Sequence, residues 1–190
     1  MSMVFHLGRD VKEYNARHDQ IIDKLIEDGR IRCEKCTELM VRHSSYVRSV
    51  KETTQEIEYT VVYCKSCKKY PALIPDFMLR CKHYSGNEVE SVILDSATIP
   101  VDRIDTKASE RTVRRWIAQI GERVSGAVGM LKIAFMEVGR AISELSIVPG
   151  SAYSELEQVL DMAPSDAKYS GNKLGLANIW LGAFGRSSYI

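Results

Sequence analysis

Four cysteines form two identically spaced pairs, and they carry the clearest chemistry in the sequence. The first pair is Cys33 and Cys36, the second is Cys64 and Cys67, and two residues separate the cysteines of each pair. A pair at this spacing can turn both thiolates towards one ion, and two pairs supply the four thiolates that tetrahedral zinc prefers. The sequence therefore predicts one structural Zn²⁺ per chain, in a closed shell without an open position for catalysis.

Three other uses of the cysteine pairs stay open but are less favoured. A redox dithiol normally lies at a helix start, whereas these pairs flank predicted strands. An iron–sulfur cluster also takes four thiolates, but its usual ligand spacings differ. Disulfides are disfavoured because we expect a cytoplasmic protein: residues 1–7 are too short for a signal core, and no uncharged apolar run approaches the roughly 20 residues that cross a bilayer.

A fifth cysteine, Cys81, lies two residues before His83. The two could replace a ligand of the first site or build a second site, but two ligands alone cannot close a metal shell, so we expect Cys81 to be a buried thiol. His6, His18 and His43 are isolated in the sequence, and we expect them to be core or surface residues.

The segment between the cysteine pairs predicts the β-hairpin that would bring them together. Apolar residues occupy every second position of residues 56–63, which is the period of a half-buried strand. Residues 39–41 and 46–50 also look extended, and the polar residues 51–55 suit a turn. A helix with three- and four-residue apolar spacing is expected before the hairpin, over residues 10–28.

After residue 84 the sequence predicts mainly helices. Ser85 and Glu88 form a capping-box pattern, a short helix can follow Pro100, and a third helix begins near Ser109. This succession outlines a helix-turn-helix. The predicted class is α+β, with a small four-cysteine zinc-ribbon hairpin, a helix-turn-helix and C-terminal helices. The expected units are an N-terminal helix (1–29), the zinc ribbon (30–83), the helix-turn-helix (84–123) and a long heptad-patterned helix with further helices (124–190).

The third helix of this outline is the candidate DNA-binding element. Its apolar residues would face the core and turn polar residues outward, and arginine can pair with both guanine and phosphate. The alternative is that these cations form an ordinary solvated face. The residues expected to contact DNA are Lys107, Ser109, Arg111, Thr112, Arg114, Arg115 and Gln119.

A seam of apolar residues at heptad spacing runs from Val124 to Leu145. It could pack in the chain's own core or join two chains as a homodimer. The intramolecular alternative is favoured because alanines widen the stripe and glycines weaken an isolated helix. The seam residues are Val124, Val128, Leu131, Phe135, Val138, Ile142 and Leu145.

The net charge of +1 conceals an uneven distribution. Residues 30–82 hold five more cations than acids, whereas the charged residues of 141–167 are all acids. The low total excludes indiscriminate coating of nucleic acid, and the local excess permits a defined patch.

The order of these features resembles zinc-ribbon and helix-turn-helix proteins of bacterial mobile elements, in particular the DNA-binding front part of insertion-sequence transposases. The cysteine pairs and the stretch from Thr112 to Trp116 carry the resemblance, which covers residues 31–120. It implies binding of double-stranded DNA in transposition or its regulation.

The sequence offers no catalytic constellation and no space for a transposase nuclease domain. We therefore expect a sequence-specific DNA-binding regulatory or accessory factor and not an enzyme. The alternative is a zinc-ribbon module that docks a protein partner within a larger complex.

Overall fold

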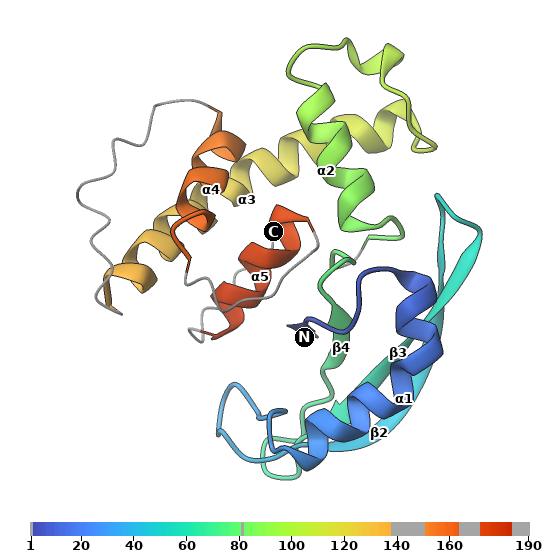
Figure 1. The fold of residues 1–190 in the computed structure, drawn as a ribbon, viewed down its shortest axis with the longest axis vertical. Helices are drawn as coiled ribbons and strands as arrows, with labels where there is room; N and C mark the ends of the chain where they lie inside the picture. The colour runs from blue at the N-terminus through green and yellow to red at the C-terminus, as the bar shows by residue number, and fades with distance from the viewer. Residues whose placement is uncertain (1, 81, 138–150, 164–171, 184–190) are drawn as a thin grey trace.

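The computed structural model describes residues 2–80, 82–137, 151–163 and 172–183, and its fold is α+β (Figure 1). These residues form one four-stranded sheet and five α-helices. The four cysteines lie together at one end of the sheet region, and four of the five described α-helices follow them in the chain. The predicted fold class, a four-cysteine ribbon-like module followed by a mainly helical part, is confirmed.

The sheet has the strand order β1-β4-β3-β2. The strands are β1 (Ser2–Phe5), β2 (Val41–Val50), β3 (Gln55–Tyr63) and β4 (Ala72–Pro75). β2 and β3 form the predicted antiparallel hairpin, in which Val41 lies opposite Tyr63 and a bulge interrupts the register after Arg42. β1 pairs with β4 in parallel. The sequence pattern did not predict β1 and β4, because four residues are too few to establish a period of two.

The first helix, α1 (Val11–Glu27), begins and ends as its sequence predicts. The Asp10 side chain accepts a hydrogen bond from the backbone N–H of Glu13 at 2.8 Å, and Gly29 adopts a left-handed φ of 66° after the helix. The first bond satisfies an amide that lacks a partner inside the helix. The second position is one that glycine occupies without strain.

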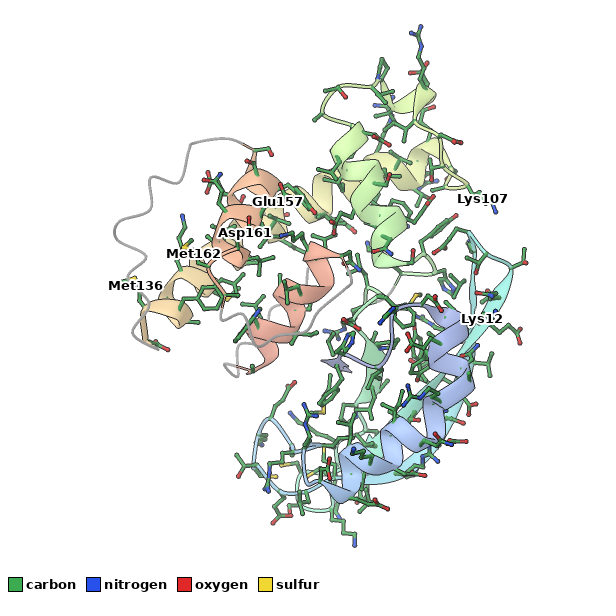
Figure 2. The ribbon with its side chains drawn as sticks, in the orientation of Figure 1. Lys12, Lys107, Met136, Glu157, Asp161 and Met162 are labelled. Atoms are coloured by element: carbon green, nitrogen blue, oxygen red, sulfur yellow. The ribbon has the colours of Figure 1, made fainter. Side chains whose placement is uncertain are left out.

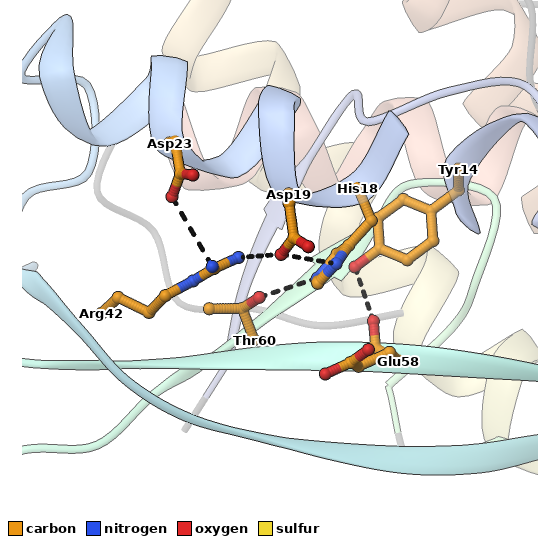
Figure 3. A network of polar contacts seen from close by, with 7 residues as sticks. All are labelled: Tyr14, His18, Asp19, Asp23, Arg42, Glu58 and Thr60. Atoms are coloured by element: carbon orange, nitrogen blue, oxygen red, sulfur yellow. Dashed lines mark hydrogen bonds and ion pairs between the residues drawn. The ribbon is translucent and has the colours of Figure 1, made fainter. Parts of the chain in front are cut away.

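Polar contacts attach α1 to the hairpin (Figure 3). The Tyr14 hydroxyl donates to the carbonyl of Glu58 at 2.7 Å, and His18 Nε2 lies 2.8 Å from Thr60 Oγ1. At the helix surface, Arg42 pairs with Asp19 at 2.7 Å. His18 and Thr60 are both buried, so the contact between them gives each a hydrogen-bond partner that water cannot provide there.

The helical part contains α2 (Gly86–Asp95), α3 (Glu110–Glu137), α4 (Ala152–Leu160) and α5 (Lys173–Ala183). The sequence predicts one helix near Ser109 and another from Val124, and this separation is wrong. α3 is one continuous helix of 28 residues, and the expected boundary at residue 123 lies inside it.

The described part of the heptad seam is buried within the chain. Val124, Val128, Leu131 and Phe135 belong to a cluster that also contains residues of α4 and α5. The intramolecular interpretation is confirmed for these four positions, and Val138, Ile142 and Leu145 lie outside the described residues. A homodimer through the seam stays a prediction, and it would have to displace α4 and α5 from these positions.

The link between α2 and α3 differs from the expected helix-turn-helix outline. The middle helix is a single 3₁₀ turn, Val101–Arg103, within the connecting residues 96–109. A helix-turn-helix joins two helices through about three or four residues. The short helix predicted after Pro100 is thus present as a 3₁₀ turn and not as an α-helix, and the backbone is extended at Ile104.

Two apolar cores divide the described residues. One contains residues from Leu7 to Met78 and lies between α1, the sheet and the cysteine module. The other contains residues from Leu79 to Leu181 and joins α2 to α5. Packing thus unites the expected segments 1–29 and 30–83, and likewise the segments 84–123 and 124–190. Among the described helices, none has the length and apolar character required to cross a membrane.

The tip of the β2–β3 hairpin connects the two regions. Glu52 at the tip accepts a hydrogen bond from the backbone N–H of Ser85, the residue that caps α2, at 2.6 Å. Its carbonyl accepts a hydrogen bond from Lys107 Nζ at 2.5 Å, and Lys107 is labelled near the hairpin tip in Figure 2. The N–H of Lys51 also donates to the carbonyl of His83 at 2.8 Å. The hairpin thus extends from the cysteines to the start of the helical region.

Candidate metal centre and nucleic-acid interface

The first cysteine pair lies in a tight backbone knuckle before β2. The N–H of Cys33 donates to the carbonyl of Glu38 at 2.9 Å, and the N–H of Thr37 donates to the carbonyl of Cys33 at 2.8 Å. Thr37 has a φ of 59°, a left-handed conformation that reverses the chain directly after Cys36. The knuckle therefore directs both sulfurs of the pair to one side.

The second pair repeats this geometry at the same sequence spacing. The N–H of Cys64 donates to the carbonyl of Lys69 at 3.0 Å, and the N–H of Lys68 donates to the carbonyl of Cys64 at 2.9 Å. Lys68 has a φ of 55°, which corresponds to Thr37 in the first knuckle. The two knuckles thus have the same local backbone structure, although their residues other than the cysteines differ.

The hairpin brings the two knuckles together. β2 follows the first knuckle, β3 leads into the second, and the pairing of Val41 with Tyr63 aligns them. All four cysteine sulfurs lie within 4.8 Å of one another. Metal–sulfur bonds of about 2.3 Å in a tetrahedral site place the sulfurs about 3.8 Å apart. The four free thiols fit one tetrahedral ion, and the residues predicted as ligands are those that the fold assembles.

The pKa values of the cysteine thiols show why such a cluster favours a cation. Burial opposes ionisation of Cys33, but hydrogen bonds from the backbone amides of Lys35 and Cys36 and from neighbouring thiols lower its pKa to about 7. The amide of Glu38 favours the Cys36 thiolate, yet the surrounding thiols and burial raise the pKa of Cys36 to about 12. Crowded thiolates repel one another. A divalent ion would remove this repulsion and allow all four to ionise.

Three lysines surround the second knuckle: Lys65, Lys68 and Lys69. None of them forms an ion pair with a residue that the structure describes. The Ser66 hydroxyl donates to the Glu38 carboxylate at 2.5 Å, so one acidic side chain of the first knuckle reaches the second. The lysines would offset the negative charge of a metal tetrathiolate, and they leave this side of the module basic.

The seven residues expected to contact DNA cluster around the start of α3. Val113 and Trp116 are buried on the opposite side of the helix, as their spacing predicts. The Ser109 hydroxyl accepts a hydrogen bond from the N–H of Thr112 at 3.4 Å, so Ser109 caps the helix. Thr112 is half-buried, whereas the other six predicted residues are exposed: Lys107, Ser109, Arg111, Arg114, Arg115 and Gln119.

Besides Ser109 and Thr112, which bond to each other, three of these residues have partners within the chain. Lys107 bonds to the hairpin tip, and Arg114 pairs with Glu110 one turn earlier at 2.6 Å. Gln119 accepts a hydrogen bond from Lys82 Nζ at 3.2 Å. Arg111 and Arg115, in contrast, form no ion pair with any described residue. These two arginines, one helical turn apart, are the cations of the start of α3 that are available to an external anion.

The isolated histidines have ordinary structural surroundings. His18 is buried, and burial lowers its pKa. His6 Nδ1 lies 2.9 Å from the buried carboxylate of Asp76, and His43 is exposed. His83 is also exposed, whereas Cys81 lies outside the described residues.

An aromatic cluster that the sequence did not reveal lies beside the second knuckle. The rings of Tyr63 and Tyr70 stack with centroids 4.7 Å apart, and the ring of His43 meets Tyr70 edge-on at 4.9 Å. Lys68 Nζ lies 5.7 Å from the centroid of the Tyr63 ring. The tyrosines flank the second cysteine pair in the sequence, which was the available signal.

A family model for a domain of unknown function (DUF6431) matches residues 33–116. Comparison with curated proteins and comparison with solved structures each gave no match. The matched segment begins at the first cysteine, includes both knuckles and the hairpin, and ends at Trp116 in the early part of α3. It therefore covers both the candidate metal centre and the available arginines.

Proposed function

We propose that this protein binds double-stranded DNA through the start of α3, and that a Zn²⁺ ion held by Cys33, Cys36, Cys64 and Cys67 orders the region that supports this helix. The observation that carries the proposal is the pair of exposed arginines, Arg111 and Arg115, without ion pairs to described residues. The role proposed is that of a regulatory or accessory factor related to the DNA-binding part of mobile-element transposases.

The proposed metal has a structural role. Four thiolates around one Zn²⁺ leave no open coordination position, so the ion would supply folding free energy and not a reacting group. The hairpin between the two knuckles ends at Glu52, which bonds to Ser85 and Lys107 near the starts of α2 and α3. Ordering of the knuckles therefore supports the position of the DNA-binding helix through the hairpin.

The proposed DNA contact uses the first turns of α3. Arg111 and Arg115 are separated by four residues and lie on the same side of the helix. The start of a helix also attracts anions, because its first N–H groups lack partners within the helix. Val113 and Trp116 anchor the other side in the core. This arrangement presents two guanidinium groups on a rigid support to phosphates or to guanine edges.

The test compares the double variant Arg111→Ala/Arg115→Ala with the matched variant Arg17→Ala. Arg17 is an exposed arginine of α1, remote in sequence from the proposed contact. We expect the double variant to weaken duplex binding by about tenfold or more. The slope of log K against log salt should also decrease by about 0.9 for each phosphate that the variant no longer neutralises.

Fluorescence anisotropy with genomic duplex fragments at several salt concentrations measures both quantities. Arg17→Ala should bind like the wild type. Equal binding by the double variant and the wild type would refute the assignment. A defined protein partner that co-purifies with a chain lacking duplex affinity would support the alternative, a protein-interaction module.

A further inference from the structure

We infer that the aromatic and basic surface beside the second knuckle binds single-stranded nucleic acid by stacking bases on tyrosine rings. This surface, here called the tyrosine surface, consists of His43, Tyr46, Tyr63, Lys68 and Tyr70. It is separate from the duplex contact proposed for α3. In Figure 1 the knuckle end of the hairpin and the start of α3 lie far apart along the longest axis.

The first part of the tyrosine surface is the stacked pair of Tyr63 and Tyr70. Their ring planes differ by 25°, and Tyr63 is half-buried beneath its partner. Tyr70 remains 52% exposed, whereas most of the ring of a tyrosine in a folded protein is usually buried. The ring of His43 supports Tyr70 edge-on. Tyr70 is therefore a supported aromatic ring with an accessible surface, as base stacking requires.

A second tyrosine pair lies further along the same hairpin. The rings of Tyr46 and Tyr59 meet at 5.4 Å, and Tyr46 is 41% exposed whereas Tyr59 is buried. Tyr59 and Tyr63 lie on the same side of β3 because four residues separate them. At about 3.3 Å per residue this separation is about 13 Å. The two exposed rings thus follow one strand direction, which suits a ligand with successive flat groups.

The side of the hairpin that carries these tyrosines is not the side that α1 covers. α1 contacts the side chains of Thr60 and Arg42 through His18 and Asp19. Thr60 alternates with Tyr59 along β3, and so it lies on the opposite side of the strand. The helix that packs on the hairpin therefore leaves Tyr46 and Tyr70 exposed.

Charge decides which ligand the surface fits. Exposed tyrosines also bind proline-rich peptides, which need no cations. Here Lys68 Nζ lies 5.7 Å from the centroid of the Tyr63 ring, and Lys65 and Lys69 belong to the same knuckle. None of the three lysines forms an ion pair with a described residue. Rings with adjacent cations that form no ion pair match a chain that alternates bases and phosphates.

The surface favours a single strand over a duplex. In a duplex the faces of the bases are covered by their neighbours, so tyrosine cannot stack on them without unstacking the helix. In a single strand the faces are free, and stacking does not depend on the sequence because every base has a π-face. DNA and RNA share this chemistry, and the 2′-hydroxyl distinguishes them.

The experiment measures anisotropy of labelled oligothymidylate and oligouridylate with the full, metal-loaded chain. We expect Tyr70→Ala to weaken binding by about tenfold, equivalent to about 1.4 kcal/mol, while Tyr70→Phe retains the ring and the affinity. Lys68→Ala should lower the salt slope by about 0.7 if Lys68 contacts one phosphate of a single strand. Lys12→Ala is the matched control, because Lys12 is an exposed lysine of α1 and lies at the tip end of the hairpin in Figure 2.

The relative binding of the two oligonucleotides identifies DNA or RNA as the preferred strand. The inference is overturned if Tyr70→Ala binds both as well as the wild type, or if the wild type binds a proline-rich peptide and neither oligonucleotide. The variant Arg111→Ala/Arg115→Ala should retain single-strand binding. If this variant loses duplex binding but Tyr70→Ala leaves single-strand binding unchanged, the present inference fails and the duplex contact stands. If the variant retains duplex binding but Tyr70→Ala weakens single-strand binding, the duplex contact fails and the present inference stands.

Discussion

The sheet region and the helical region are stabilised by different means. In the sheet region, α1 and the hairpin share an apolar core but also need buried polar contacts such as that of His18 with Thr60, and the knuckles enclose four thiols. In the helical region, Trp116, Phe135 and their neighbours form an apolar core between α2, α3, α4 and α5. The knuckles contain few apolar side chains, so ligand chemistry must replace hydrophobic burial there. Sensitivity to metal and to pH should therefore concentrate in the sheet region.

Removal of the metal should have the largest effect and separate the two regions. We expect Cys64→Ser to lose most of the one Zn²⁺ per chain and to unfold the knuckles. The binding free energy of a structural zinc, about 10–16 kcal/mol, is also folding free energy, and the variant would lose it. Both tryptophans of the sequence, Trp116 and Trp180, belong to or pack against the helical core. Their fluorescence should remain native while the hairpin loses its hydrogen-exchange protection.

Metal analysis of the purified variants provides the first measurement, and tryptophan emission provides the second. Cys81→Ser is the matched control and should retain the metal. If tryptophan emission shifts to the red when the metal is removed, the two regions fold as one unit and the contrast between them is wrong.

Detachment of the hairpin tip should have a moderate effect. Glu52→Ala removes the acceptor of the Ser85 N–H, and we expect it to lower the free energy of unfolding by about 1–2 kcal/mol. Glu52→Gln retains an acceptor oxygen and should lose less. The amide of Lys51, which bonds to the carbonyl of His83, reports on the junction because its hydrogen exchange should accelerate in Glu52→Ala. Unchanged exchange would mean that the tip does not connect the regions.

Protonation of His18 should have the smallest effect. Burial lowers its pKa below 6.5, while nearby Asp19 and Glu58 oppose this shift and Arg42 adds to it. Between the ordinary pKa and the lower folded value, the unfolded chain binds more protons. The free energy of unfolding should therefore decrease as the pH falls below about 6.5.

His18→Gln removes this titration, so the slope of unfolding free energy against pH should be shallower than in the wild type. Metal release at low pH affects both proteins and cancels in the difference. Chemical denaturation at a series of pH values measures the slopes, and equal slopes would assign the acid sensitivity to other groups.

Local signals in the sequence predicted much of this molecule, and the failures have identifiable causes. The cysteine spacing predicted the four-cysteine cluster because each knuckle is a local structure that the hairpin has only to bring together. The separation of α3 into two helices was wrong because the buried positions continue at helical spacing across the expected boundary, from Ile120 to Val124. The partners of Lys107 and Gln119 depend on contacts between distant segments, which no local pattern contains.

The continuity of α3 gives the molecule a mechanical property. Its 28 residues form a rod of about 42 Å, of which the first turns carry Arg111 and Arg115 and the later turns are enclosed by α4 and α5. A rod transmits rotation along its whole length. The packing of Leu131 and Phe135 therefore sets the direction in which the two arginines point. A change in the packing of that distant core would change this direction without any substitution at Arg111 or Arg115.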